Sequence, residues 1–313
     1  MRKEFWYRTL FKLKIYEVSG DSFQRLFNDV MGYSYPDFQT VAPYGNFGDG
    51  GNDGWVENEK RYFQVYGKKA DSKTDLSYIL SKATGDFAKI QSTWGKIDYY
   101  HFVYNDRFEG APAPVIKAVS ELKTAHNIQE STVLDGRKLE AIFISLSDDQ
   151  RCSILGGVPS EITDFIDSRL VAELLTYLAD KALQSFSLLN QTAPDFDEKM
   201  QLNGLTEPVS SYLKANSYQT RDIEDFLASR DVGLKQSIAF EMQEIYQESL
   251  SQIPQQDDAA NIRYVWMVEK LIPKLANQHP HTFKAYREAA QVILANYFEI
   301  CDIYEHPSTI TTA

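Results

Sequence analysis

The sequence has little cysteine and no long hydrophobic run, and each shortage excludes a class of protein. Only 2 of its 313 residues are cysteines, too few for a disulfide framework or a zinc site, so we expect Cys152 and Cys301 to be buried thiols. No stretch of about 18 apolar residues occurs, which predicts no transmembrane helix and no membrane partner. Met1 to Trp6 lacks an apolar run after its basic pair, which argues against a secretory signal and predicts a cytoplasmic protein.

Positive charge is scarce in the second half of the chain. Residues 151–313 hold 13 Lys and Arg against 23 Asp and Glu, a net charge of −10, whereas residues 1–150 hold 19 against 21, a net charge of −2. Because affinity for phosphate comes largely from Lys and Arg, we expect any DNA to bind through the first half. The acidic half favours a protein partner with a basic surface, although solubility alone would also explain its charge.

Residues 1–150 alternate between helical and strand-like patterns, which predicts an α/β domain with a mixed sheet flanked by helices. The expected elements are a helix at 22–31 stopped by Gly32, an extended run at 38–42, a glycine-rich loop at 45–54, a hairpin of 55–56 and 61–66, a helix at 75–94, a strand at 98–104, a helix at 114–123, a strand at 129–134 and a helix from 136 that Asp135 caps.

Residues 151–313 show helical periodicity throughout and predict an all-α domain. Helices are expected at 161–189, 207–229, 234–251, 260–278 and 281–305. Gly156-Gly157 and Pro159 interrupt both patterns and place the boundary between 147 and 159. We therefore expect an α/β domain at 1–150 and a helical, acidic partner-docking domain at 151–313.

The glycine-rich loop carries the first candidate site residues. Gly48 to Gly54 contains four glycines in seven residues, with Asp49 and Asp53 among them. It lacks the Gly-Lys-Ser/Thr end of a phosphate-binding loop, so nucleotide binding is not expected there. A tight turn with positive φ angles would explain the glycines without any function.

Four segments of the first half resemble a known nuclease superfamily. They are Gly20-Asp21-Ser22-Phe23-Gln24, Gly48-Asp49-Gly50-Gly51-Asn52-Asp53-Gly54-Trp55, Phe63-Gln64-Val65-Tyr66 and Phe102-Val103-Tyr104-Asn105-Asp106. In this order they resemble the PD-(D/E)XK, restriction-endonuclease-like superfamily, and more closely its Mrr-like branch, where glutamine can replace the second acid. Over residues 15–160 the chain is similar to proteins of bacterial ABC three-component, Lamassu-related defence systems. This resemblance implies a restriction-endonuclease-like fold and a role in anti-phage or anti-plasmid defence beside an ATPase partner.

The resemblance also implies a catalytic set of Asp53, Gln64 and Lys68. In such nucleases a carboxylate at the start of the second strand and an acid and a lysine on the third strand surround the scissile phosphate. Mg²⁺ or Mn²⁺ would be held by Asp53, with Asp49 as a second ligand. The sequence departs from the pattern where Tyr66 replaces the usual lysine and Gln24 replaces an acid of the first helix.

Three functions remain open at this stage. The chain is a divalent-metal-dependent DNA endonuclease, or a catalytically inactive module of the same fold that binds nucleic acid or recruits partner proteins such as an ATPase subunit. The third is a helical toxin-like or structural protein in which the first half only scaffolds. Outside the main set, His101 in an apolar strand is expected to be a core histidine. Asn105-Asp106, at the end of that strand, favours a turn over a site.

Overall fold

The chain divides into an α/β unit, Phe11–Ile154, and a helical unit made of Met1–Leu10 and Leu155–Ala313. The structure is a computed structural model. It describes residues 2–67, 75–160, 166–182, 195–219, 221–228, 232–274, 282–300 and 303–305. The long helix α1 (Arg2–Glu17) contributes its first residues to the helical unit and its remaining residues to the α/β unit.

A five-stranded sheet of order β1-β2-β3-β4-β5 forms the centre of the α/β unit. Its strands are β1 (Phe38–Thr40), β2 (Gly54–Val56), β3 (Arg61–Tyr66), β4 (Tyr99–Tyr104) and β5 (Glu130–Leu134). The first three strands pair antiparallel, and β3, β4 and β5 pair in parallel. Short 3₁₀ turns, η1 (Gly45–Phe47) and η2 (Glu57–Glu59), lie in the two hairpin connections. The expected mixed sheet and its hairpin are confirmed.

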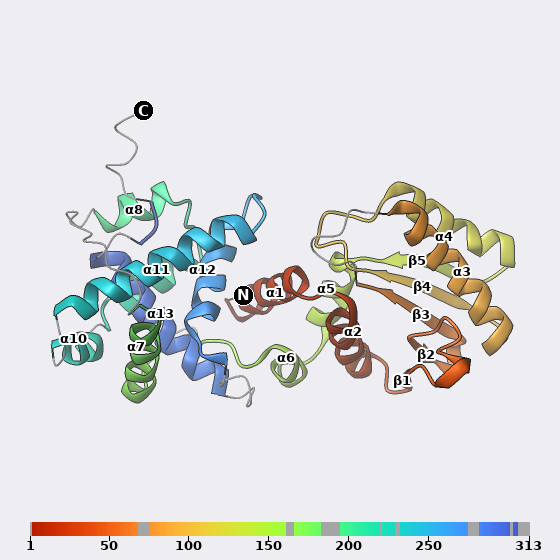
Figure 1. Ribbon diagram of the computed structural model, residues 1–313, viewed down its shortest axis with the longest axis horizontal. Helices are drawn as coiled ribbons and strands as arrows, with labels where there is room; N and C mark the ends of the chain where they lie inside the picture. Colours follow the sequence, from red (N-terminus) through yellow and green to blue (C-terminus); the bar gives the residue numbers. More distant parts are fainter. Residues whose placement is uncertain are drawn as a thin grey trace. The chain divides into compact units, whose positions relative to one another are not determined.

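Helices cover both faces of this sheet. They are α2 (Gly20–Ser34), α3 (Leu76–Trp94), α4 (Ala113–His126) and α5 (Gly136–Ser145), followed by α6 (Asp148–Leu155). The carboxylate of Asp135 accepts a hydrogen bond from the Lys138 N–H and caps α5 as expected. On one face α2 packs against β3, where the rings of Phe27 and Phe63 lie 5.4 Å apart. The helices α3 and α4 lie together on the other face (Figure 1).

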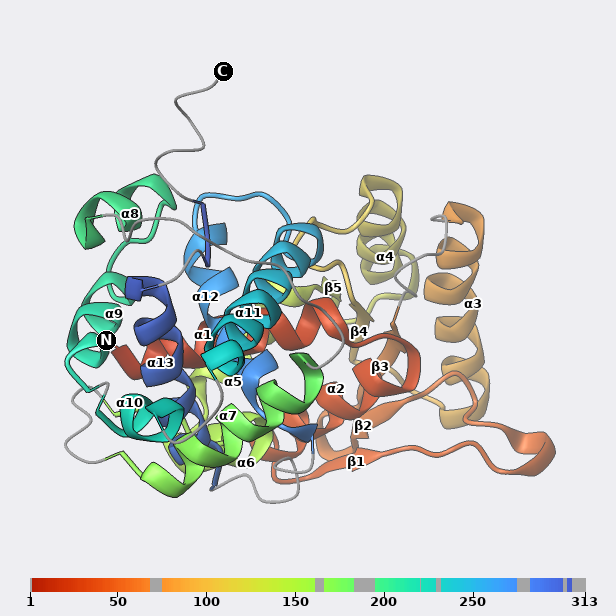
Figure 2. The same cartoon turned by 60° about the vertical axis from the view of Figure 1, so that its left-hand side comes forward.

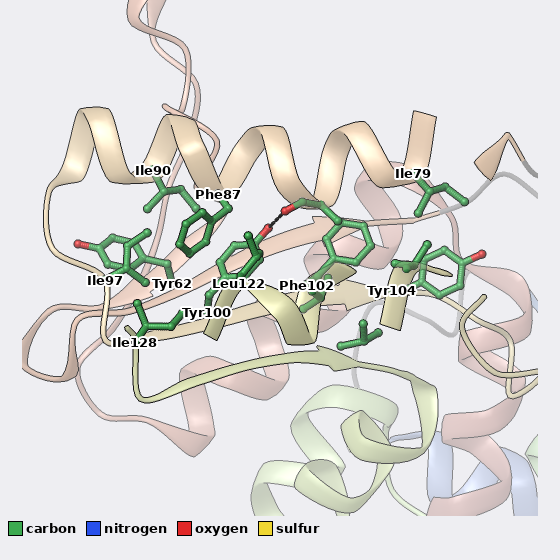
Figure 3. Close-up of a cluster of buried hydrophobic side chains, with 14 residues drawn as sticks. Tyr62, Ile79, Phe87, Ile90, Ile97, Tyr100, Phe102, Tyr104, Leu122 and Ile128 are labelled. Atoms are coloured by element: carbon green, nitrogen blue, oxygen red, sulfur yellow. Dashed lines mark hydrogen bonds between the residues drawn. The ribbon is translucent and has the colours of Figure 1, made fainter. Parts of the chain in front are cut away.

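The core between α3, α4 and the sheet is rich in tyrosine. Because strand side chains alternate between faces, Tyr62 of β3 points toward α3 whereas Phe63 points toward α2. The hydroxyl of Tyr100 donates a hydrogen bond to the Ala83 carbonyl of α3 (Figure 3). Aromatic rings with a polar tip fill a large volume here and still find a hydrogen-bond partner.

The helical unit is built around a buried central helix, α13 (Phe283–Ile300), whose residues 287–298 are all buried. The other helices are α7 (Ser168–Ala182), α8 (Phe196–Leu202), α9 (Val209–Ser217), α10 (Arg221–Ala228), α11 (Val232–Gln252) and α12 (Ala259–Leu271). Trp6 of α1 packs beside Tyr212 of α9, with 6.0 Å between ring centroids. The all-α character expected of the second half is confirmed for the residues described.

The buried Arg287 of α13 connects the segment that begins at Leu155 to the central helix of this unit. The guanidinium of Arg287, 2% exposed, donates to both carboxylate oxygens of Glu269 at 2.6 and 2.9 Å. It also donates to the backbone carbonyls of Gly157 at 2.6 Å and Leu155 at 3.0 Å. A buried arginine is tolerated only when its donors are paired in this way.

Several expected details are wrong. Gly32 does not stop α2, because a helix interior admits glycine at a modest cost and the helix continues to Ser34. The helix expected at 207–229 is two, α9 and α10, separated by residues 218–220, of which 220 lies outside the described residues. Cys152 of α6 is half-buried rather than buried, and Cys301 lies outside the described residues. The helices α1, α6 and α8 were not anticipated.

Among the residues described, none of the helices combines the length and the apolar character needed to cross a membrane.

Candidate active site

The glycine-rich loop between β1 and β2 lies directly on α3. It extends past the strands toward the Trp94 end of that helix (Figure 2), where the Trp94 indole N–H donates to the Asp49 carbonyl at 3.1 Å. A Cβ atom added to Gly51 would lie 2.7 Å from the backbone oxygen of Asp86, and one on Gly50 would lie 2.7 Å from the Trp94 indole. Both residues have positive φ angles, so glycine is required for backbone conformation and for close approach.

Replacing Gly51 by alanine is therefore expected to push the loop away from α3. Gly45→Ala is the matched control, because Gly45 also has positive φ but open space around its Cβ position. We expect Gly51→Ala to lower the free energy of unfolding of the α/β unit by about 1–3 kcal/mol more than Gly45→Ala does. Urea titration with hydrogen exchange of β3 peptides measures this, and equal losses would contradict the close packing.

Asp53 is fixed at the point where the loop enters β2. Its backbone N–H donates to the Phe63 carbonyl at 2.9 Å, and its Oδ2 accepts from the Val65 N–H at 2.7 Å. The pairing of Gly54 with Phe63, continued by one residue, places Asp53 opposite Gln64. From α2, Gln24 Nε2 donates to Asp53 Oδ1 at 3.0 Å.

The environment of Asp53 works against its ionisation. The residue is 8% exposed, and burial raises its pKa from 3.8 to about 6. The hydrogen bond from the Val65 N–H opposes this shift, the charge of Asp49 adds to it, and the nearby Lys82 opposes it again. A carboxylate with a raised pKa at the end of a hairpin, surrounded by other charged groups, is typical of a functional site.

Gln64 offers the second oxygen of the site. It is 4% exposed, and on β3 it lies on the same face as Tyr62, toward α3. Its Nε2 makes only a long contact, 3.4 Å, to the Val65 carbonyl. Its Oε1 is buried and has no hydrogen-bond partner among the described residues. A buried polar atom without a partner costs free energy, and a water molecule or an ion bound beside it would satisfy this oxygen.

Lys82 and Asp86 of α3 complete the surroundings of Asp53, and the sequence analysis did not identify them. The carboxylate of Asp86, 2% exposed, pairs with Lys89 Nζ at 2.7 Å and with Lys82 Nζ at 3.2 Å. Burial acts against the charge of Lys82, but the carboxylates of Asp86 and Asp53 outweigh burial and raise its pKa, so it is an ammonium. The i−4 and i+3 spacing of the lysines around Asp86 was the available signal.

The remaining predicted residues have separate outcomes. Lys68, together with its neighbour Lys69, lies outside the described residues. The Oδ1 of Asp49 accepts the Gly51 N–H at 2.7 Å, which closes a turn, and its charge acts on Asp53. Gln24 contacts Asp53 directly, so this position keeps a link to the site without an acid.

The residues outside the main set are structural. His101 lies between the Arg61 guanidinium and the Thr132 hydroxyl, and burial lowers its pKa to about 3, so it is a neutral core histidine. Asn105 Nδ2 donates to the carbonyls of Ile15 and Val18 at the end of α1. The carboxylate of Asp106 accepts three backbone N–H groups, those of Phe108, Gly110 and Gly136. The pair forms a turn.

The donor set can be tested against a divalent cation. Among the described residues, no group of three or more His, Cys, Asp or Glu side chains is placed to hold a metal. Mg²⁺, however, commonly takes one or two carboxylates and completes its shell with water and substrate phosphates. The Asp53 carboxylate retains lone pairs beyond its two hydrogen bonds, and Gln64 Oε1 is without a partner. The residues fit a Mg²⁺ ion that a phosphate helps to hold.

The fold thus defines a two-unit protein with a mixed α/β unit and a helical unit. Residues 169–305, from α7 to α13, match the family model CTD10, the C-terminal domain 10 of the ABC-three component (ABC-3C) systems. The match supports membership of the chain in such a system, and with it a role in bacterial defence and the presence of protein partners. Comparison with curated proteins gave no match, and comparison with solved structures gave none either.

Proposed function

We propose that this chain is the DNA-cleaving effector of an ABC-three component anti-phage or anti-plasmid defence system, with a restriction-endonuclease-like α/β unit. The observation that carries the proposal is the placement of the buried Asp53 carboxylate opposite Gln64, whose Oε1 has no partner. A binding site for a phosphate-bound cation would account for a carboxylate kept at Asp53 despite the cost of its burial, and for the unsatisfied oxygen of Gln64.

The order of strands supports the same proposal. An antiparallel meander, β1 to β3, is followed by α3 and by β4, which pairs in parallel with β3. Asp53 precedes β2 and Gln64 lies within β3, which are the positions that the resemblance to PD-(D/E)XK nucleases assigns to the first acid and to the residue replacing the second.

In DNA hydrolysis, two residues would hold the metal ion and others would orient the carboxylate. Asp53 and Gln64 would hold Mg²⁺ or Mn²⁺, with Asp49 adding negative charge beside them. A bound cation would neutralise charge on the scissile phosphate and make a water molecule more acidic. Gln24 and the Val65 N–H keep the Asp53 carboxylate in one orientation.

Metal-dependent nicking of plasmid DNA tests the activity. Wild-type protein, alone and assembled with its partner proteins, is incubated with supercoiled plasmid and Mg²⁺ or Mn²⁺. We expect nicked and linear products that vanish when EDTA removes the metal and return when Mn²⁺ is added in excess. An assembled system that leaves the plasmid supercoiled with both metals overturns the nuclease proposal.

A second candidate function is a catalytically inactive module that binds DNA or recruits partners. The observation in its favour is that Gln24 occupies the position where an acid is expected, and its amide donates a hydrogen bond to Asp53. This candidate predicts DNA binding or partner assembly that does not respond to divalent metal. Retention of plasmid on the protein with unchanged affinity in EDTA and in Mn²⁺, without cleavage, would favour it.

The helical unit is proposed to dock protein partners, including the ATPase subunit of the system. Its support is the match of residues 169–305 to an ABC-three component C-terminal domain and the net charge of −10 over residues 151–313. Because acidic surfaces attract basic partners over a screened range, we expect the complex to weaken as NaCl rises from 50 to about 500 mM. Analytical ultracentrifugation measures this, and an affinity independent of salt would argue against a charged interface.

A further inference from the structure

We infer that Lys82 of α3 supplies the cation that binds the scissile phosphate at the Asp53–Gln64 site, with Asp86 as the residue that positions it. The inference rests on the proposed function and extends it, because the third strand has Tyr66 where the resemblance implies a lysine. The ligand is a phosphodiester. Lys82 comes from the helix α3, whereas the sequence analysis considered only the third strand and Lys68 after it.

The first support is the geometry around Asp86. This carboxylate is 2% exposed and already has Lys89 Nζ at 2.7 Å as a partner, so one ammonium satisfies its charge. Lys82 Nζ lies 3.2 Å from the other oxygen. Because Lys89 already balances the charge of Asp86, Lys82 can pair with a second anion, either the Asp53 carboxylate or a phosphate oxygen.

The second support is the position of this turn beside the loop that carries Asp53. A Cβ atom on Gly51 would lie 2.7 Å from the backbone oxygen of Asp86, so the loop packs closely on this turn, and Asp53 follows Gly51 by two residues. Lys82, one helical turn before Asp86, is close enough to Asp53 for the two charges to interact. Gln64 lies on the sheet face that α3 covers. Lys82 is also 36% exposed, so its ammonium is accessible to a ligand.

The experiment compares two lysines that share one carboxylate. Lys82→Met and Lys89→Met remove the same charge from the same helix, and both variants leave Asp86 with one lysine. In the plasmid assay at saturating DNA, we expect Lys82→Met to lower the cleavage rate by about 100-fold. Lys89→Met should change it by no more than a few-fold, and Lys82→Arg, which keeps the charge, should recover part of the rate.

A binding measurement keeps the inference testable without cleavage. DNA affinity is measured against salt concentration in Asp53→Asn protein without metal, with each lysine variant added to it. We expect Lys82→Met to reduce the slope of log K against log salt by about one, and Lys82→Arg and Lys89→Met to leave it unchanged. Equal slopes for Lys82→Met and Lys89→Met overturn the assignment of Lys82.

The two proposals fail separately. If wild-type protein cleaves DNA and the lysine variants cleave and bind alike, Lys82 has no phosphate role and the nuclease proposal stands. If wild-type protein does not cleave DNA in any assembly, the nuclease proposal falls, while a slope reduced only by Lys82→Met still assigns a phosphate contact to Lys82.

Discussion

Asp53→Asn is expected to stabilise the protein at neutral pH by up to about 3 kcal/mol, the value of a pKa shift from 3.8 to about 6. Burial makes the ionised carboxylate costly, and asparagine has almost the same shape without the charge. Its Oδ1 can accept the Val65 N–H, and its Nδ2 can donate to Gln24 once that amide turns over. The substitution therefore removes a charge without leaving a donor unpaired.

The sign of the pH dependence follows from the direction of the shift. A carboxyl group with a raised pKa in the folded protein binds its proton more tightly there than in the unfolded chain. Its contribution to stability is present below about pH 4 and is lost as the pH rises through about 6. The advantage of Asp53→Asn should therefore be small at pH 4 and full at pH 7.5, on either side of the sequence pI of about 5.0.

Urea titrations of wild-type and Asp53→Asn protein at these two pH values measure the effect. Asp37→Asn is the control, because Asp37 is exposed and shares a hydrogen bond with Asn58 near the other end of the β1–β2 pair. An Asp53→Asn protein that is less stable than wild type at pH 7.5 would mean that Asp53 serves the fold. A gain in stability at the cost of activity is expected where a residue is kept for function.

The second large effect is expected in the helical unit, where Arg287→Met should lower stability by about 3–5 kcal/mol. The substitution keeps much of the side chain's length and removes every donor. The Glu269 carboxylate loses its ion-pair partner, and the carbonyls of Leu155 and Gly157 lose their hydrogen-bond donor. Breaking a buried ion pair by removing one member costs more than the pair contributes when intact.

Hydrogen exchange separates this effect from changes in the α/β unit. We expect faster exchange in peptides covering α12 and α13 and unchanged exchange in β3 and β4. The double variant Arg287→Met with Glu269→Gln should recover part of the loss, because it also removes the uncompensated charge. A single variant as stable as wild type would contradict the role of Arg287 in holding the segment after α6.

The periodic segments of the α/β unit were predictable from the sequence, and the reasons are local. The helix of α3 has apolar residues at helical spacing, and Asp135 precedes α5 as a cap. The hairpin of β2 and β3 follows from apolar segments on either side of the polar run Glu57 to Lys60. In each case the local pattern and the tertiary packing favour the same structure.

The missed elements show where local patterns are insufficient. Apolar residues lie on all sides of α1, whose Trp6, Leu10, Phe11 and Ile15 are all buried, so no single helical face marks it in the sequence. Gly32 is exposed near the end of α2, where its Cβ position meets no other atom, so it neither breaks the helix nor packs closely.

Two residues of the candidate site, Asp53 and Gln64, were predictable from local patterns, whereas Lys82 was not. Asp53 and Gln64 lie on neighbouring strands of one hairpin, so strand register alone places them opposite each other. Lys82 follows Gln64 by 18 residues and comes from the helix α3, and only the packing of Gly51 on Asp86 shows that α3 lies beside the site. A search for lysine restricted to the third strand could not find it.

Cleavage by the Asp53→Asn protein, assembled with its partners, tests the central claim most directly. Wild-type, Asp53→Asn and Asp37→Asn proteins are compared for the initial rate of plasmid nicking in Mn²⁺, with hydrogen exchange confirming that all three are folded. The proposed site predicts a loss of about 1,000-fold or more for Asp53→Asn and a rate close to wild type for Asp37→Asn. Nicking by Asp53→Asn at the wild-type rate would contradict the assignment of this site.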